Sequence, residues 1–193
     1  MGIEMEYSAG QTPLGEEEMD GLRRRVDSRN VLNALEEQNI IRALNWSSRI
    51  TVGLEEILSE EFIKRVHQRM FGDVWSWAGS FRRTNKNIGV DKFEISLRLK
   101  DICNDCRFWI ENKTFAADEI AVRFKHRIVL VHPFANGNGR HSRMIGDILI
   151  SKYFKRPEFS WSGKSLISVG ESRRKYIAAL RKADLGDYPD LVT

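Results

Sequence analysis

Residues 131–143 read Val131-His132-Pro133-Phe134-Ala135-Asn136-Gly137-Asn138-Gly139-Arg140-His141-Ser142-Arg143, and this stretch decides how the rest of the chain is interpreted. Apolar residues recur at helical spacing on both sides of it, over residues 120–131 and 144–154. The pattern therefore predicts a loop between two helices that ends at the start of the second helix.

That position favours the binding of an anion. The first backbone N–H groups of a helix have no intrahelical partner, and the helix dipole adds partial positive charge, so phosphate suits the site. Gly137 and Gly139 let the backbone approach a ligand closely, while Arg140 and Arg143 offer planar, bidentate donors. His132 is the group able to take a proton near neutral pH. The stretch therefore combines a phosphate site with a candidate base.

These residues resemble the active-site motif of the Fic family, His-x-Phe-x-Asp/Glu-Gly-Asn-Gly-Arg-x-x-Arg. Every fixed position matches except one, because Asn136 stands where most members have Asp or Glu. Across nearly its whole length the chain is also similar to the Fic relatives called mobile mystery protein B. The stretches that carry this wider likeness are Thr12-Pro-Leu, Leu32-Asn33, Glu37-Gln38-Asn39-Ile40, Trp75-Ser-Trp77-Ala-Gly79, Phe81-Arg82, Asn87-Ile-Gly-Val90 and Arg174-Lys-Tyr-Ile177.

The expected fold is mainly α, a Fic-type helical bundle with a small β-hairpin flap next to the active-site loop. We expect an N-terminal arm, partly irregular, over residues 1–28, a Fic-type catalytic domain over 29–185 and a frayed C-terminal tail over 186–193. Apolar periodicity and capping residues predict helices over residues 30–47, 59–71, 96–112, 118–131 and 172–183. Asn30, Ser59 and Asp118 are the predicted N-caps.

Residues 81–93 lack helical periodicity. Thr, Ile and Val around an Asn-Lys-Asn turn predict a short β-hairpin here. The resemblance identifies it as the Fic flap, which holds the backbone of a target protein beside the active site, through Asn87, Ile88, Gly89 and Val90. The alternative is an ordinary surface hairpin.

The resemblance implies a protein nucleotidyltransferase that moves AMP from ATP to a Ser, Thr or Tyr hydroxyl of a target protein. His132 would deprotonate that hydroxyl, whose oxygen would attack the α-phosphate while pyrophosphate leaves. Asn138 would help to hold the α-phosphate region. The nucleotide would lie on a set of phosphate-binding residues: Gly137, Asn138, Gly139, Arg140 and Arg143.

Asn136 changes the expected metal chemistry. The carboxylate usual at this position ligates a Mg²⁺ ion that bridges the phosphates, and an amide oxygen is a neutral, weaker ligand for a hard cation. We therefore expect Mg²⁺ as a cofactor, held weakly or indirectly at Asn136, with ATP as the substrate.

Self-inhibition is not evident in the sequence. Many Fic proteins carry a Ser/Thr-x-x-x-Glu-Gly/Asn helix whose Glu pairs with the second motif arginine, here Arg143. The Glu111-Asn pair is preceded by Arg107 rather than by Ser or Thr, and Glu55 is followed by Glu56. We therefore expect inhibition by a separate helix-turn-helix companion, as in toxin–antitoxin pairs.

Three other functions were weighed. A phosphotransferase resembling the Doc branch would alter the Gly-Asn-Gly-Arg part of the motif, which is intact here. A non-catalytic module that binds nucleotide or protein stays open because of Asn136. A metal-dependent nuclease ranks last, because the carboxylates that such metals need are missing. The pair Cys103 and Cys106 lies within a helical pattern, so buried apolar cysteines are expected rather than a zinc or redox site.

The composition limits the remaining classes. The chain has 193 residues, a net charge of +4 and 41% hydrophobic residues, which suits one domain with a proper core. No apolar run reaches the roughly 20 residues that span a bilayer, and no secretion signal is recognised at the N-terminus. The charges lie scattered on helices, so we expect no direct nucleic-acid partner and no membrane. Two cysteines favour a reducing, cytoplasmic setting.

Overall fold

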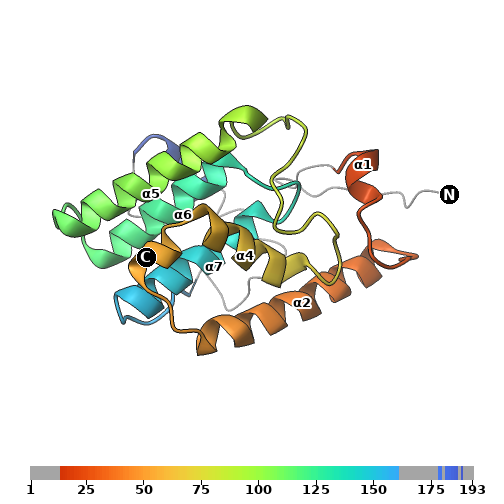
Figure 1. Ribbon diagram of the computed structural model, residues 1–193, viewed down its shortest axis with the longest axis horizontal. Coiled ribbons are helices and arrows are strands. Elements are labelled where there is room, and N and C mark those ends of the chain that lie inside the picture. The colour runs from red at the N-terminus through yellow and green to blue at the C-terminus, as the bar shows by residue number, and fades with distance from the viewer. Residues whose placement is uncertain (1–13, 161–177, 180, 187, 189–193) are drawn as a thin grey trace.

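The computed structural model describes residues 14–160, 178–179, 181–186 and 188, and it is mainly helical (Figure 1). An antiparallel bridge between Leu22 and Trp75 is the one β-pairing in the described part of the chain. The elements in order are α1 (Glu16–Met19), α2 (Arg29–Arg49), α3 (Leu54–Ile57), α4 (Glu60–Phe71), the 3₁₀ turn η1 (Lys92–Glu94), α5 (Ile95–Glu111), α6 (Ala117–Val131), α7 (Asn138–Ile148) and the π-helical turn η2 (Leu149–Tyr153).

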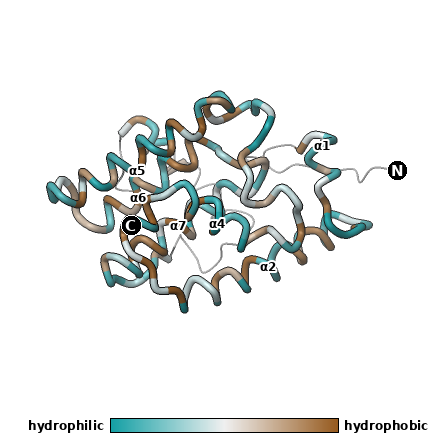
Figure 2. Tube along the Cα trace, in the orientation of Figure 1, coloured by the Kyte–Doolittle hydropathy of each residue, from teal (hydrophilic) through white to brown (hydrophobic). Residues whose placement is uncertain are grey.

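Helices α5, α6 and α7 pack in sequence order, α4 lies against α7, and α2 lies along α4 (Figure 1). Hydrophobic and hydrophilic residues alternate along α5 and α6, as expected for helices with one buried face (Figure 2). The buried core includes large side chains from α4 and α6 and from the motif loop, among them Phe62, Phe71, Phe124 and Phe134. The loop and the start of α7 are thus built on the core of the bundle.

Helix α4 forms as the sequence predicts. The Ser59 hydroxyl caps it by accepting a hydrogen bond from the Phe62 N–H at 3.1 Å, and the helix ends at Gly72. Two predicted caps are wrong. Ser28 rather than Asn30 caps α2, and α6 begins after Ala116, so that Asp118 lies within its first turn. An acidic residue in the first turn still interacts favourably with the helix dipole, which explains why the pattern is similar.

Cys103 and Cys106 are both buried on α5, as expected. Burial raises the pKa of the Cys103 thiol to about 12 and keeps the Cys106 thiol protonated as well. Among the described residues, no group of three or more His, Cys, Asp or Glu side chains could hold a metal ion. The pair therefore packs as small apolar side chains.

The predicted β-hairpin is not formed, because residues 81–91 contain no strand. Side chains, rather than a backbone ladder, hold this segment. The Asn85 amide accepts a hydrogen bond from the Lys92 N–H at 2.8 Å and donates one to the Asp91 carboxylate at 2.7 Å. The Arg82 guanidinium binds the carbonyls of Thr84 and Val90. The Thr84 and Val90 carbonyls thus bind the Arg82 side chain instead of a backbone N–H of a neighbouring strand.

The helix predicted over residues 172–183 lies mostly outside the described residues; of that range, 178–179 and 181–183 are helical. Within the predicted tail, Tyr188 is buried and its hydroxyl lies 3.2 Å from Nδ1 of His126 on α6. No helix in the described part of the chain is both long enough and apolar enough to cross a membrane.

Candidate active site

His132 ends α6 in a left-handed conformation, with φ 54° and ψ 58°. Pro133 follows and disfavours the right-handed helical region for the residue before it, which explains why the helix stops here. A left-handed conformation costs a non-glycine residue about 1–2 kcal/mol, so its surroundings must hold it in place. The Nε–H of Arg82 donates to the His132 carbonyl at 2.7 Å in a buried contact.

The His132 side chain is buried, and its pKa is lowered to about 4. Burial is the main cause, because it disfavours the charged imidazolium. The positive charges of Arg82 and Lys86 lower the pKa further, whereas a hydrogen bond with the backbone of Val129 opposes the shift. The imidazole is therefore neutral at pH 7 and can accept a proton.

The loop after His132 is closed on itself by Asn138. Its side-chain oxygen accepts a hydrogen bond from the Phe134 N–H at 2.9 Å, and its amide nitrogen donates to the Phe134 carbonyl at 2.8 Å. The Phe134 ring is fully buried and stacks on the His67 ring, with centroids 3.7 Å apart. The Asn138 side chain, predicted to hold the α-phosphate region, is thus occupied in shaping the loop.

The two glycines occupy the start of α7. Gly137 is the N-cap with φ 77°, and the first intrahelical bond runs from the His141 N–H to the Gly137 carbonyl at 2.9 Å. A Cβ atom at Gly137 would meet the Phe71 ring at 2.5 Å, whereas one at Gly139 would meet no described atom within 4 Å. The turn at Gly139 therefore has open space beside it, whereas the turn at Gly137 is filled by the Phe71 ring.

Asn136 uses both of its oxygens within the protein. Its side-chain oxygen accepts a hydrogen bond from the Gly137 N–H at 2.6 Å, and its carbonyl lies 3.0 Å from Nε2 of His67. Because the Gly79 N–H donates to Nδ1 of His67 at 3.0 Å, Nε2 carries the proton and donates to Asn136. An engaged, neutral amide oxygen does not fit a Mg²⁺ ion held by the protein, since Mg²⁺ is usually held through one or two carboxylates as well as substrate phosphates.

The two motif arginines, both on α7, interact with different neighbouring helices. Arg140 pairs with the buried Glu36 of α2 at 2.8 Å, and the other carboxylate oxygen of Glu36 accepts a hydrogen bond from Trp75 Nε1 at 2.7 Å. The charge of Arg143 and, above all, burial lower the pKa of Lys125 on α6 well below its usual range. Part of the hydrogen-bonding capacity of Arg140 is therefore directed to Glu36 rather than to a ligand.

Of the predicted flap residues, Gly89 and Val90 contact the end of α6 and His132, and Asn87, Ile88 and Gly89 are exposed. The Val90 N–H donates to the Val131 carbonyl at 3.3 Å. A Cβ atom at Gly89, where φ is 94°, would meet the Cβ of His132 at 2.6 Å, so a glycine is needed for this approach. The segment thus lies directly against the candidate base, even though it is not a hairpin.

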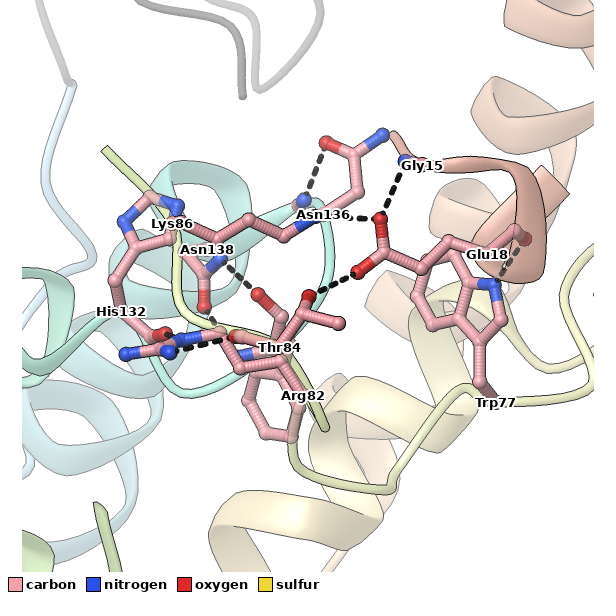
Figure 3. A network of polar contacts seen from close by, with 11 residues as sticks. Gly15, Glu18, Trp77, Arg82, Thr84, Lys86, His132, Asn136 and Asn138 are labelled. Carbon is pink, nitrogen blue, oxygen red and sulfur yellow. Dashed lines mark hydrogen bonds and ion pairs between the residues drawn. The ribbon is translucent and has the colours of Figure 1, made fainter. Parts of the chain in front are cut away.

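The N-terminal helix α1 reaches the same site through Glu18 (Figure 3). Its carboxylate pairs with the Lys86 ammonium at 2.5 Å and accepts a hydrogen bond from the Thr84 hydroxyl at 3.2 Å. The Glu18 carbonyl accepts a hydrogen bond from Trp77 Nε1 at 2.8 Å. The ion pair is mostly buried, with the side chains 10% and 12% exposed.

Several residues that shape the site were missed by sequence reasoning. Glu36 and Arg140 are 104 residues apart in the sequence, and His67 and Asn136 are 69 residues apart, so no local sequence pattern predicts either contact. Arg82 was noted only as part of the resemblance, and the Glu18–Lys86 pair gave no signal, since acidic and basic residues are common on helix surfaces.

Comparisons with known proteins place this geometry in a family. Residues 57–150 match the model of the Fic/DOC family, a range that contains α4, α5, α6 and α7 with the whole motif. The chain belongs to the Fic/DOC family. Within the matched range, residues 131–143 carry Asn136 at the position where the motif usually has an acid.

Two curated relatives carry the name protein adenylyltransferase. The chain is 25% identical to protein adenylyltransferase Fic of Aedes aegypti over 169 residues, which is 86% of this chain and 32% of that protein. It is 30% identical to protein adenylyltransferase fic-1 of Caenorhabditis elegans over 138 residues, 67% of this chain and 25% of that protein. The chain thus spans about a third or less of the curated relatives it matches.

The same fold is found among solved structures. Fic-1 of C. elegans, residues 134–508, superposes with a TM-score of 0.67 at 24% identity, covering 88% of this chain and 49% of that one. This likeness shows the Fic fold. The narrower likeness to the mobile mystery protein B group stays a prediction.

Proposed function

We propose that this Fic domain is a protein adenylyltransferase, which transfers AMP from ATP to a Ser, Thr or Tyr hydroxyl of a target protein. One observation carries the proposal: the neutral imidazole of His132 is fixed at the loop that leads into the open glycine turn of α7. The names of the two curated relatives support the same class of reaction.

In the proposed step, His132 accepts the proton of the target hydroxyl. The oxygen attacks the α-phosphorus in line, the bond from that phosphorus to the α–β bridging oxygen breaks, and pyrophosphate leaves. The N–H groups of Asn138, Gly139 and Arg140 come before the first intrahelical bond of α7, so they can face the phosphate oxygens on which charge grows. A base of this kind is worth about 10²–10⁴ in rate.

We assign no residue of the described chain to Mg²⁺. Asn136 is neutral and already accepts the Gly137 N–H, so any Mg²⁺ would enter as part of the ATP complex. The Asn136→Asp variant would restore a carboxylate at this position. We expect it to lower the Mg²⁺ concentration that gives half-maximal transfer, because a carboxylate is the stronger ligand for this hard cation.

The test uses ATP labelled in the α-phosphate, with the purified protein alone and with lysate proteins as acceptors. Wild-type protein should transfer the label, and His132→Ala should reduce transfer by about 10²-fold or more while still binding ATP. Gln68→Ala changes an exposed residue of α4 and serves as the control: it should transfer the label at the wild-type level.

The alternative functions give different outcomes. Transfer from γ-labelled but not α-labelled ATP would replace the proposal with the Doc-like phosphotransferase. ATP binding without transfer of either label, across acceptor lysates from several sources, would favour the non-catalytic binding module.

We further propose that the domain acts in the cytoplasm as the toxin-like half of a two-gene pair, held inactive by a separate helix-turn-helix companion. The absence of an inhibitory-helix motif from the sequence supports a separate inhibitor. If the purified chain transfers no label until a substitution away from the motif releases it, inhibition is internal and the companion is not needed.

A further inference from the structure

Arg82 lies between the flap segment and the motif loop, where it binds both Thr84 and His132 (Figure 3). It is 4% exposed, although arginine is almost never fully buried without partners. Its Nε–H donates to the His132 carbonyl at 2.7 Å, and its backbone N–H donates to the Pro133 carbonyl at 2.9 Å. One residue thus binds two consecutive carbonyls of the loop that holds the candidate base.

The other end of the guanidinium binds residues 84–90, here called the flap segment. Nη1 donates to the Thr84 carbonyl at 2.9 Å and lies 3.4 Å from the Asn85 side-chain oxygen, while Nη2 donates to the Val90 carbonyl. Thr84 and Val90 are the two ends of the segment. A single side chain therefore closes the flap segment and links it to His132.

The contacts explain why an arginine is present. The guanidinium offers five N–H donors in a rigid planar fork, whereas a lysine ammonium is a compact point charge with three donors on a flexible stem. Lysine can keep the positive charge near His132 but cannot reach the His132, Thr84 and Val90 carbonyls together. Charge-assisted bonds to carbonyls are also stronger than neutral ones, which suits a residue that must hold a strained backbone.

We propose that Arg82 is a positioning residue, which fixes the left-handed backbone of His132 and the flap segment relative to each other so that base and target hydroxyl meet in reactive geometry. The proposal rests on the proposed transferase function. Arg82 contacts the carbonyl of His132 and not the open turn at Gly139, so it acts through His132 and the flap rather than on the nucleotide. A misplacement of about 1 Å can cost roughly 10²-fold in rate.

The experiment compares Arg82→Lys and Arg82→Met with Arg83→Met, a change at the exposed neighbouring arginine. For Arg82→Lys we expect kcat to fall by about 10- to 100-fold, with the Kd for ATP within about twofold of wild type. Arg83→Met should keep the ATP affinity and the protection of the loop. A wild-type kcat in Arg82→Lys would overturn the proposal, as would a loss of rate explained by a matching loss of ATP binding.

Two readouts do not depend on transfer activity. Amide hydrogen exchange should become faster at Arg82 and Val90, whose N–H groups bind the motif loop, but not within α7. In an NMR titration, the pKa of His132 should rise in Arg82→Met, because one of the two charges facing it is lost while Lys86 remains, and should change less in Arg82→Lys. Unchanged exchange in both variants would overturn the proposal even if the domain proves to have another function.

Discussion

Gly137 and Gly139 were both predicted to bind phosphate, but their surroundings in the structure differ. Gly137 has a positive φ and lies against the Phe71 ring, so its lack of a side chain is needed for the fold. Gly139 lies in the first turn of α7 with open space beside it, so the fold itself does not require a glycine there, and we propose that ligand binding does. The motif alone does not separate these two roles.

Substituting each glycine by alanine separates folding from binding. Gly137→Ala should lower the free energy of unfolding by at least about 1–2 kcal/mol, the cost of a left-handed alanine. Gly139→Ala should leave stability unchanged or raise it by about 0.5–1 kcal/mol, the usual gain from alanine in a helix, yet weaken ATP binding by about tenfold or more. Chemical denaturation and titration calorimetry measure the two effects. ATP binding by Gly139→Ala at wild-type affinity would argue against a phosphate at this turn.

For single residues, the sequence identifies the candidate site residues but not the side-chain contacts that they make in the fold. His132, Gly137 and Gly139 are recognisable because they occur together in one short motif. The roles of Asn138 and Arg140 were assigned to phosphate by resemblance, whereas in the structure their side chains bind Phe134 and Glu36. A side chain with several donors binds the acceptors that the fold brings near it, and these acceptors can lie far away in the sequence.

Helix α1 reaches the site although it has only four residues, and it is too short to be stable by itself. It depends on the contacts of Glu18 with Lys86 and Thr84, and on the Trp77 indole that binds the Glu18 carbonyl. The predicted description of residues 1–28 as an irregular arm did not include this helix. A four-residue helix carries no detectable periodicity, which is why its docking is visible only in the structure.

Glu18→Gln should release α1 from the flap segment, because it leaves the mostly buried Lys86 ammonium without its carboxylate. The expected loss of stability is about 1–3 kcal/mol, and amide exchange should become faster at Gly15, whose N–H binds the Glu18 carboxylate at 2.7 Å. Glu17→Gln, at an exposed position of the same helix, should change neither quantity. Equal behaviour of the two variants would mean that the ion pair does not hold α1.

Elements with strong periodicity were predicted best. The apolar residues and cap of α4 predicted both its start and its end, and the motif was correctly placed between two helices. The flap was interpreted as a hairpin because β-branched residues flank an Asn-Lys-Asn turn. The pattern could not show that Asn85 and Arg82 would take the backbone groups a ladder requires. Local propensity predicts strands poorly where side chains bind the backbone N–H and carbonyl groups that a strand would pair.

Across the whole molecule, three buried histidines surround the motif loop. Burial is the main cause that lowers the pKa of His67 well below 6.5 and the pKa values of His132 and His141 to about 4. Each is neutral in the folded protein at pH 7 and has an ordinary pKa near 6.5 when unfolded. The contribution of His132 and His141 to stability is therefore complete above pH 6.5 and is lost as the pH falls toward 4, and the contribution of His67 changes in the same direction.

We expect the free energy of unfolding to decrease between pH 7 and pH 5 by about 2 kcal/mol for each of His132 and His141, since the unfolded chain binds the protons that the folded chain excludes. Urea denaturation at pH 5, 6 and 7 measures the effect. In His132→Ala, the decrease in the free energy of unfolding between pH 7 and pH 5 should be smaller by the contribution of one histidine, about 2 kcal/mol. A stability that is constant over this range would show that these imidazoles take up protons without unfolding.

The fold of the whole chain followed from the resemblance rather than from patterns alone. A helical bundle was expected, and the likeness to Fic-1 of C. elegans bears it out. The contacts that join the bundle at its site were not predictable, because they link segments far apart in the sequence. Glu36 with Arg140 and His67 with Asn136 are the main examples.

The separation of Glu36 and Arg140 along the sequence also delays the formation of their ion pair during synthesis. The two residues are 104 positions apart, and chains are made at about 5–20 residues per second, so the carboxylate exists for roughly 5–20 s before its arginine does. Until then α2 and α4 can pair, but the carboxylate lacks its arginine partner. Until residue 140 is made, a nascent chain therefore lacks this ion pair, and a translational pause before residue 140 would lengthen the period in which α2 and α7 are not yet joined by it.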